Sequence, residues 1–94
     1  MVHITLPDVF TSELYNLIPK QRELINGLLD KRIVLNYSLD MERKNIWVFF
    51  EVKNREELIN ILNTFPIIKD VKVAVHDLAF YDTAPFPIQD PIMN

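Results

Sequence analysis

The order in which the hydrophobic pattern changes its period is the feature that most limits the folds open to this chain. Strand patterns, with alternating or continuous apolar residues, occupy four segments, at residues 2–6, 33–39, 46–52 and 71–82. Apolar residues recur every three or four positions, as in helices, over residues 14–29 and 58–65. The order is therefore strand, helix, strand, strand, helix, strand, which is a split βαβ arrangement. We expect an α+β domain with a four-stranded antiparallel sheet and both helices on one of its faces.

A proline interrupts the first helical pattern. Pro19 lacks the N–H that a helix interior requires, so we expect one short helix to end near Ile18 and another to begin with Pro19 in its first turn. A single kinked helix is the alternative. The second helical pattern begins after Asn54, which forms a capping box with Glu57, and ends at Pro66.

The length of the chain allows one hydrophobic core. With 94 residues there is no room for a second independent core, and we place the domain at residues 1–82. The remaining segment, 83–94, alternates Pro85, Pro87 and Pro91 with large apolar residues. Proline suits an extended conformation, so we expect this segment to be an arm laid on a neighbouring subunit, with a frayed terminus as the alternative.

Composition excludes several classes of function. The chain has no cysteine and only two histidines, far apart in sequence, so we expect no disulfide, no metal site and no cofactor. One glycine cannot supply a phosphate-binding loop. A net charge of −3 with scattered basic residues argues against nucleic acid as a partner. The longest apolar run, Ile46–Phe50, is too short to cross a membrane, and no signal-peptide pattern is present, so we expect a cytoplasmic protein.

The two faces of the predicted sheet differ in character. The strand positions expected under the helices are almost all aliphatic: Val2, Ile4, Leu6, Ile33, Leu35, Tyr37, Ile46, Val48, Phe50, Val52, Val71, Val73 and Val75. The opposite positions mix aromatic and polar residues: His3, Thr5, Val34, Asn36, Ser38, Trp47, Phe49, Glu51, Lys72, Ala74, His76, Leu78 and Phe80. Two helices cover only one face, so a monomer would expose the aromatic residues of the other. We expect a homodimer that packs sheet against sheet and encloses a cavity.

Groups able to bind a ligand or move a proton fall on this second face. His3 and His76 are the only histidines, and Glu51 follows Trp47 and Phe49 on the same strand face. A carboxylate in apolar surroundings binds its proton more tightly, and an imidazole titrates near neutrality. Glu51 and His76 are therefore our candidate base and acid. His3, Trp47 and Phe49 are candidate ligand contacts. Each residue also has an explanation without a function. The histidines can lie at the rim of the sheet, Glu51 can be solvated at a strand end, and the aromatic residues can belong to an interface.

Charged residues in the first helical segment form a second candidate group. Lys20 and Arg22 are basic and are candidate donors of charge-assisted hydrogen bonds to a ligand carboxylate. Glu23 is a candidate base in place of Glu51. A charged surface that faces solvent explains the same helical residues without a function.

From about Lys20 to Asp82 the chain resembles the muconolactone isomerase family. The similarity is carried by residues 47–52, the helix 57–62, the turn Phe65-Pro66-Ile67 and the strand 71–78, and the first strand, which ends in Leu6-Pro7, also agrees. The resemblance implies a ferredoxin-like fold in which chains pair through their sheets and assemble into larger rings. It also implies an activity, the transfer of a proton within a small unsaturated lactone carboxylate.

Two hypotheses about function follow. The family's cluster of Trp, His, Leu and Arg side chains has no counterpart in the matching stretch Arg32–Ser38, and Glu23 alone matches an acidic family position. The first hypothesis is an isomerase that binds a small organic acid or lactone between helix and sheet, with Glu51 or Glu23 as base and His76 as acid. The alternative is a non-catalytic ligand-binding or assembly module. Cofactor-free oxygenation, as in related dimeric α/β barrels, is a third possibility.

Overall fold

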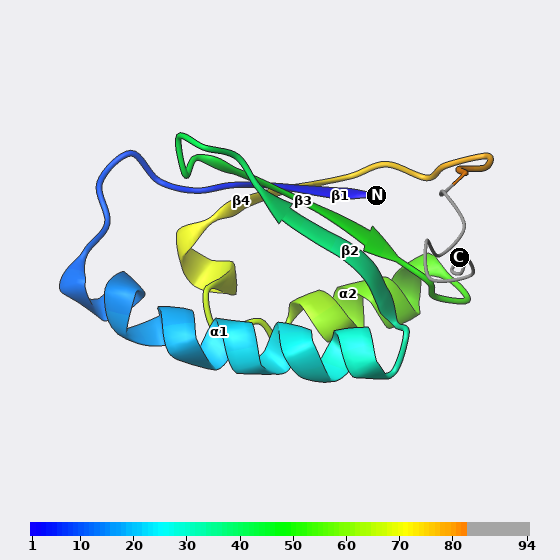
Figure 1. Cartoon of the computed structure of the whole chain (residues 1–94), viewed down its shortest axis with the longest axis horizontal. Helices are drawn as coiled ribbons and strands as arrows, with labels where there is room; N and C mark the ends of the chain where they lie inside the picture. The colour runs from blue at the N-terminus through cyan, green and yellow to red at the C-terminus, as the bar shows by residue number, and fades with distance from the viewer. Residues whose placement is uncertain (83–94) are drawn as a thin grey trace, which may run out of the picture.

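The elements, in chain order, are β1 (Val2–Thr5), α1 (Ser12–Asp30), β2 (Val34–Leu39), β3 (Asn45–Phe50), α2 (Arg55–Leu62), the short 3₁₀ helix η1 (Ile68–Asp70) and β4 (Lys72–Val75). This is a computed structural model, and the structure describes residues 1–82. The sheet has the strand order β2-β3-β1-β4, and every neighbouring pair is antiparallel. Both helices lie on the same side of the sheet (Figure 1). The predicted α+β, ferredoxin-like fold is confirmed; the arm expected at 83–94 lies outside the described residues.

The core lies between the sheet and the two helices. On the central strands, the register places Val2 opposite both Val48 and Val75, and Ile4 opposite Ile46. Their side chains meet apolar residues of the helices and of the segment that follows α2, and the buried members are Val2, Ile4, Leu6, Leu14, Ile25, Leu28, Val34, Ile46, Val48, Leu58, Leu62, Phe65 and Ile67. Removal of these side chains from water is the main force that holds the fold together.

Helix α1 continues through Pro19, so the predicted break is wrong. Thr11 caps the helix by accepting a hydrogen bond of 3.1 Å from the Leu14 N–H. Pro19 is exposed, and the carbonyl that loses its partner belongs to Tyr15, which is 63% exposed, so water can replace the missing bond. The apolar stripe extends from Leu14 before the proline to Leu28 after it. Packing of both halves against the sheet therefore offsets the lost hydrogen bond.

Strand β2 contains a bulge that reverses part of the predicted inside-outside pattern. Val34 pairs with Phe50 and Asn36 with Phe49, so Leu35 has no partner in the ladder. As a result Val34 is only 1% exposed and belongs to the core. The alternation predicts it on the face of the sheet away from the helices, which we call the open face. Leu35, expected under the helices, is 37% exposed.

Strand β4 ends at Val75 and does not reach Asp82 as expected. Its partner β1 begins at Val2, and Met1 and His76 exchange two backbone hydrogen bonds of 2.6 and 2.8 Å beside it. Beyond His76 no described strand lies alongside to accept further pairing, and the chain continues in irregular conformation to residue 82 (Figure 1). Val73 on this edge strand is 36% exposed, so the helices cover the predicted inner face incompletely there.

Candidate functional site

The face of the sheet away from the helices carries a hydrogen-bonded group that includes His3. His3 on β1 and Trp47 on β3 are register partners, and their rings stack with centroids 5.5 Å apart and planes 7° apart. The His3 Nε2 atom lies 2.8 Å from Asn45 Oδ1, and Asn45 Nδ2 donates to Asp40 at 2.8 Å. Two of the predicted ligand contacts are therefore brought together and held in place by the β2–β3 hairpin.

The same contacts determine which nitrogen of His3 carries its proton. Asp40 also accepts from the backbone N–H groups of Lys44 and Asn45, and these bonds, above all that from the Asn45 side chain, lower the pKa of Asp40. A carboxylate only accepts, so Asn45 presents its NH₂ group to Asp40 and its oxygen to His3. The neutral imidazole therefore carries its hydrogen on Nε2, and its Nδ1 is the acceptor.

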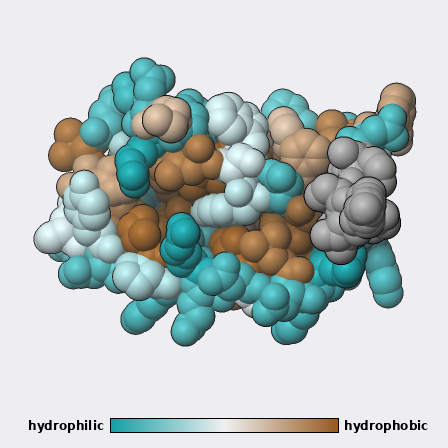
Figure 2. Space-filling view, viewed as in Figure 1, coloured by the Kyte–Doolittle hydropathy of each residue, from teal (hydrophilic) through white to brown (hydrophobic). Residues whose placement is uncertain are grey.

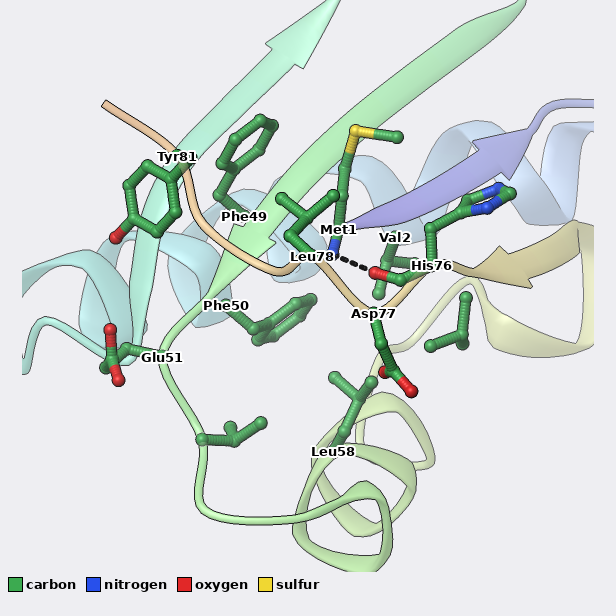
Figure 3. Close-up of a pocket in the computed structure, with 12 residues that line it drawn as sticks. Met1, Val2, Phe49, Phe50, Glu51, Leu58, His76, Asp77, Leu78 and Tyr81 are labelled. Carbon is green, nitrogen blue, oxygen red and sulfur yellow. Dashed lines mark hydrogen bonds between the residues drawn. The ribbon is translucent and has the colours of Figure 1, made fainter. Parts of the chain in front are cut away.

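A small cavity of about 250 Å³, the strand-end cavity, lies where β3 and β4 end (Figure 3). Glu51, His76 and Phe49 all line it, together with Met1 and Tyr81. Glu51 and His76 project on opposite sides, and the imidazole points away from the carboxylate (Figure 3). Both side chains are exposed in the single chain. The structure brings the predicted acid and base to one cavity but not into contact.

Phe49 contributes to the wall of the strand-end cavity. Its ring meets Tyr81 edge-on at a centroid distance of 5.6 Å. Nearby, Arg55 and Asp77 form an ion pair of 3.0 Å, but the two side chains are 53% and 81% exposed. Solvent screens such a pair, so it adds little to the stability of this end of the sheet.

A larger cavity of about 770 Å³, the helix cavity, lies between α1, the β1–α1 loop and the β2–β3 hairpin. Figure 2 shows apolar side chains gathered between the sheet and α1. Buried residues form the floor of the cavity, namely Leu6, Gln21, Ile46 and Ile67. Exposed residues form its rim, namely Asp8, Tyr15, Pro19, Arg22, Leu39, Glu42, Arg43 and Lys44. An apolar interior with few polar groups is the usual character of a small-molecule site.

The floor of the helix cavity contains one buried amide. Gln21 is 3% exposed, and within residues 1–82 neither its Nε2 nor its Oε1 atom has a hydrogen-bond partner. Such orphaned groups are rare in folded proteins. Each one loses its hydrogen bonds to water on burial and gains none in return, which lowers the stability of the fold. Gln21 is therefore the polar side chain of the described core that the fold itself does not explain.

Tyr37 of β2 lies beside Gln21 in the same cavity. Burial raises the pKa of the Tyr37 hydroxyl, while the Gln21 side chain, which lies close to the hydroxyl without meeting it in hydrogen-bond geometry, and the positive charge of Arg22 lower that pKa. The net shift is upward, so the hydroxyl stays protonated at neutral pH and can donate a hydrogen bond.

The charged rim is slightly positive. Arg22, Arg43 and Lys44 face two carboxylates, Asp8 and Glu42, around the cavity. The rim can therefore attract one acidic group while the floor takes an apolar body.

The predicted site residues are distributed over three places. His3 and Trp47 lie on the open face, and Glu51, His76 and Phe49 line the strand-end cavity. Arg22 lines the helix cavity, whereas the exposed side chains of Lys20 and Glu23 line neither cavity.

Sequence reasoning missed Gln21, although a signal was present. Position 21 lies seven residues from both Leu14 and Leu28, so it falls within the apolar stripe of the helix. A polar residue in such a stripe predicts a buried polar group.

Family models and curated proteins give no match to this chain at a significant level. The resemblance to muconolactone isomerases therefore rests on the sequence features quoted above and stays a hypothesis. Among residues 1–82, no three His, Asp or Glu side chains come together as metal ligands, and no helix has the length and apolar character needed to span a membrane.

Proposed function

We propose that this protein binds a small, partly apolar organic molecule in the helix cavity. The observation that carries the proposal is Gln21, a buried amide without a protein partner among the described residues, in the otherwise apolar floor of the cavity. The cavity volume of about 770 Å³ is within the range of small-molecule sites. A buried polar group that the fold does not satisfy is well explained by a ligand that does.

The rim supports an acidic ligand. Arg22 and Arg43 supply guanidinium groups, which can form paired hydrogen bonds with a carboxylate. Arg22 was predicted for this role, and it stands at the rim of the cavity between helix and sheet where the ligand was expected. We therefore favour an organic acid whose carboxylate lies at the basic rim and whose body reaches the floor of the cavity.

A panel of small lactones, enol acids and aromatic acids tests this proposal by thermal shift. A ligand at one hundred times its Kd adds about 2.7 kcal/mol to the free energy of unfolding, which is a shift of several degrees. We expect Arg22→Ala to weaken the response to acidic members, and Lys20→Ala, at another exposed basic residue two positions away, to leave it unchanged. If no panel member shifts the Tm, or both variants behave alike, the proposal is wrong.

Isomerisation by proton transfer is the second candidate function. Tyr37, whose hydroxyl is held protonated, lines the same cavity as the carboxylates of Asp8 and Glu42, so a proton donor and two possible bases surround one space. This arrangement favours the helix cavity over the separated Glu51 and His76. Turnover of an unsaturated lactone that Tyr37→Phe abolishes would support it; binding without turnover supports the non-catalytic module.

We also propose that two copies of the chain pair through the open faces of their sheets. Trp47 and Phe49 lie on this face, and Leu78 and Phe80, in the segment that follows β4, are 44% and 80% exposed. Contact with a second sheet would remove the aromatic residues from water. Light scattering should then give twice the chain mass of 11.1 kDa at micromolar concentration; a mass of one chain would overturn the pairing.

A further inference from the structure

We infer that the ligand of the helix cavity presents a cyclic amide edge, a neighbouring N–H and C=O, to the side chain of Gln21. This inference rests on the proposed function, because it names the chemical class of the molecule that the cavity would hold. A lactam, an imide or a heterocycle with an amide in its ring belongs to this class.

The two orphaned atoms of Gln21 set the requirement. Nε2 is a donor and needs an acceptor, whereas Oε1 is an acceptor and needs a donor, and neither has a partner among residues 1–82. A carboxylate or a lactone offers acceptors alone and would leave Oε1 unsatisfied. A cyclic amide carries its N–H and C=O on the same side, so it can pair with both atoms of the Gln21 amide at once.

The surroundings of Gln21 fit a flat, largely apolar ring. The buried side chains of Leu6, Ile46 and Ile67 share the floor with it. Two aromatic residues that line the cavity, Phe10 and the rim residue Tyr15, pack against each other with centroids 5.2 Å apart and planes inclined by 51°. These groups would contact the body of a heterocycle, and the basic rim would face any acidic substituent.

A buried water molecule is the competing explanation for Gln21. Water can both donate and accept, so it would satisfy the amide without any preference among ligands. The two explanations differ in what they predict for isosteric ligands, and the experiment uses that difference.

The test compares 2-quinolone with coumarin, two bicyclic molecules of the same shape that differ in a ring N–H against a ring oxygen. Each is titrated into the full chain, with benzoate as a third probe, and followed through assigned backbone amide resonances. We expect 2-quinolone to shift resonances around the helix cavity and to bind about tenfold more tightly than coumarin, because coumarin leaves a buried acceptor unsatisfied.

Gln21→Leu provides the decisive variant. It places an apolar side chain of similar size in the stripe of α1 and removes both orphaned atoms. We expect it to abolish the preference for 2-quinolone and to raise the Tm of the ligand-free protein by about 5 °C or more, because two unsatisfied groups leave the core. The control is Asn26→Leu, which removes an exposed amide from the same helix and should change neither.

The outcomes separate this inference from the proposed function. Equal affinity for 2-quinolone and coumarin, a preference that survives Gln21→Leu, or shifts around the strand-end cavity instead would each overturn the inference. If benzoate or a lactone binds the helix cavity and 2-quinolone does not, the inference fails and the proposed function stands. If neither these probes nor the earlier panel bind, both fail, and the water explanation of Gln21 is the better one.

Discussion

The two faces of the sheet treat their polar side chains in opposite ways. On the open face, His3, Asn45 and Asp40 satisfy one another through hydrogen bonds of 2.8 Å, and Trp47 stacks on His3. On the helix-covered face, the buried amide of Gln21 has no partner within residues 1–82. A satisfied network is explained by the stability of the fold, whereas an unsatisfied buried group requires something else. The comparison therefore favours the helix-covered face as the place where a ligand binds, although its residues are chemically less reactive than the histidines of the open face.

The largest expected effect distinguishes the two faces at neighbouring positions of β1. Ile4 points into the core and is 0% exposed, so Ile4→Ala should lower the free energy of unfolding by about 2–5 kcal/mol. Thr5 points to the open face, and Thr5→Ala should cost less than about 1 kcal/mol. Urea denaturation measures both. A comparable loss for Thr5→Ala would mean that the open face is packed as tightly as the core.

A second change examines whether the open face is an interface. Trp47→Lys would place a charge in the proposed contact between sheets and should weaken dimerisation by about 30-fold or more, as the loss of a central interface tryptophan does. Sedimentation over a concentration series measures the constant. Ile59→Lys is the matched control, since Ile59 is 46% exposed on α2, on the other side of the sheet. Equal dissociation by both variants would contradict a contact through the open face.

The hydrogen-bonded group on the open face should make stability depend on pH in the acid range. Because the pKa of Asp40 is lower in the folded protein, its contribution is complete above the ordinary value of about 4 and is lost as pH falls through the lowered value. Wild type should therefore lose more stability than Asp40→Asn between pH 5 and pH 2. Glu42→Gln, in the same loop, is the control, and parallel pH profiles for wild type and Asp40→Asn would refute the role given to Asp40.

The smallest expected effect comes from Gly27→Ala in α1, which should change the stability of the protein without changing its affinity for a ligand. No neighbouring atom lies within 4 Å of a Cβ built at Gly27, so Gly27→Ala should raise the free energy of unfolding by about 0.5–1 kcal/mol. Unlike Gln21→Leu, which should also stabilise, it should leave the affinity for 2-quinolone unchanged. Thermal denaturation and the same titration provide the readout. Loss of affinity in Gly27→Ala would show that helix stiffness, and not the amide, controls the cavity.

The topology could be predicted from sequence because it depends on the period of the apolar pattern over whole segments. The errors arose where one residue decides the outcome. Leu35 is the extra residue of a bulge, and the alternation of apolar and polar residues does not indicate where a bulge occurs. Pro19 is tolerated within α1 because the packing of the helix on both sides of it outweighs the loss of one backbone hydrogen bond. The end of β4 depends on where its partner strand begins, which is a property of the pairing and not of residues 76–82.

The candidate site was less predictable for a similar reason. Histidines and acids attract attention in a sequence, yet His76 and Glu51 project into solvent on opposite sides of a small cavity. Arg22 was expected at a ligand and lines the helix cavity. Tyr37 was expected in the core, and its hydroxyl acquires a raised pKa because the fold buries it. Burial is a property of the assembled structure, so the chemistry of these groups could not be assigned one residue at a time.

The bulge at Leu35 shifts the phase of β2 by one residue. Before it, Val34 faces α1 opposite Phe50, and after it Tyr37 faces the same side opposite Val48, although an unbroken alternation would set the two on opposite sides. The strand thereby contributes to the core at one end and to the wall of the helix cavity at the other. A chain without Leu35 would keep both pairings in a regular ladder. Leu35 is therefore one residue more than the hydrogen bonds of β2 require, and its insertion reverses the side of the sheet that each later residue of the strand faces.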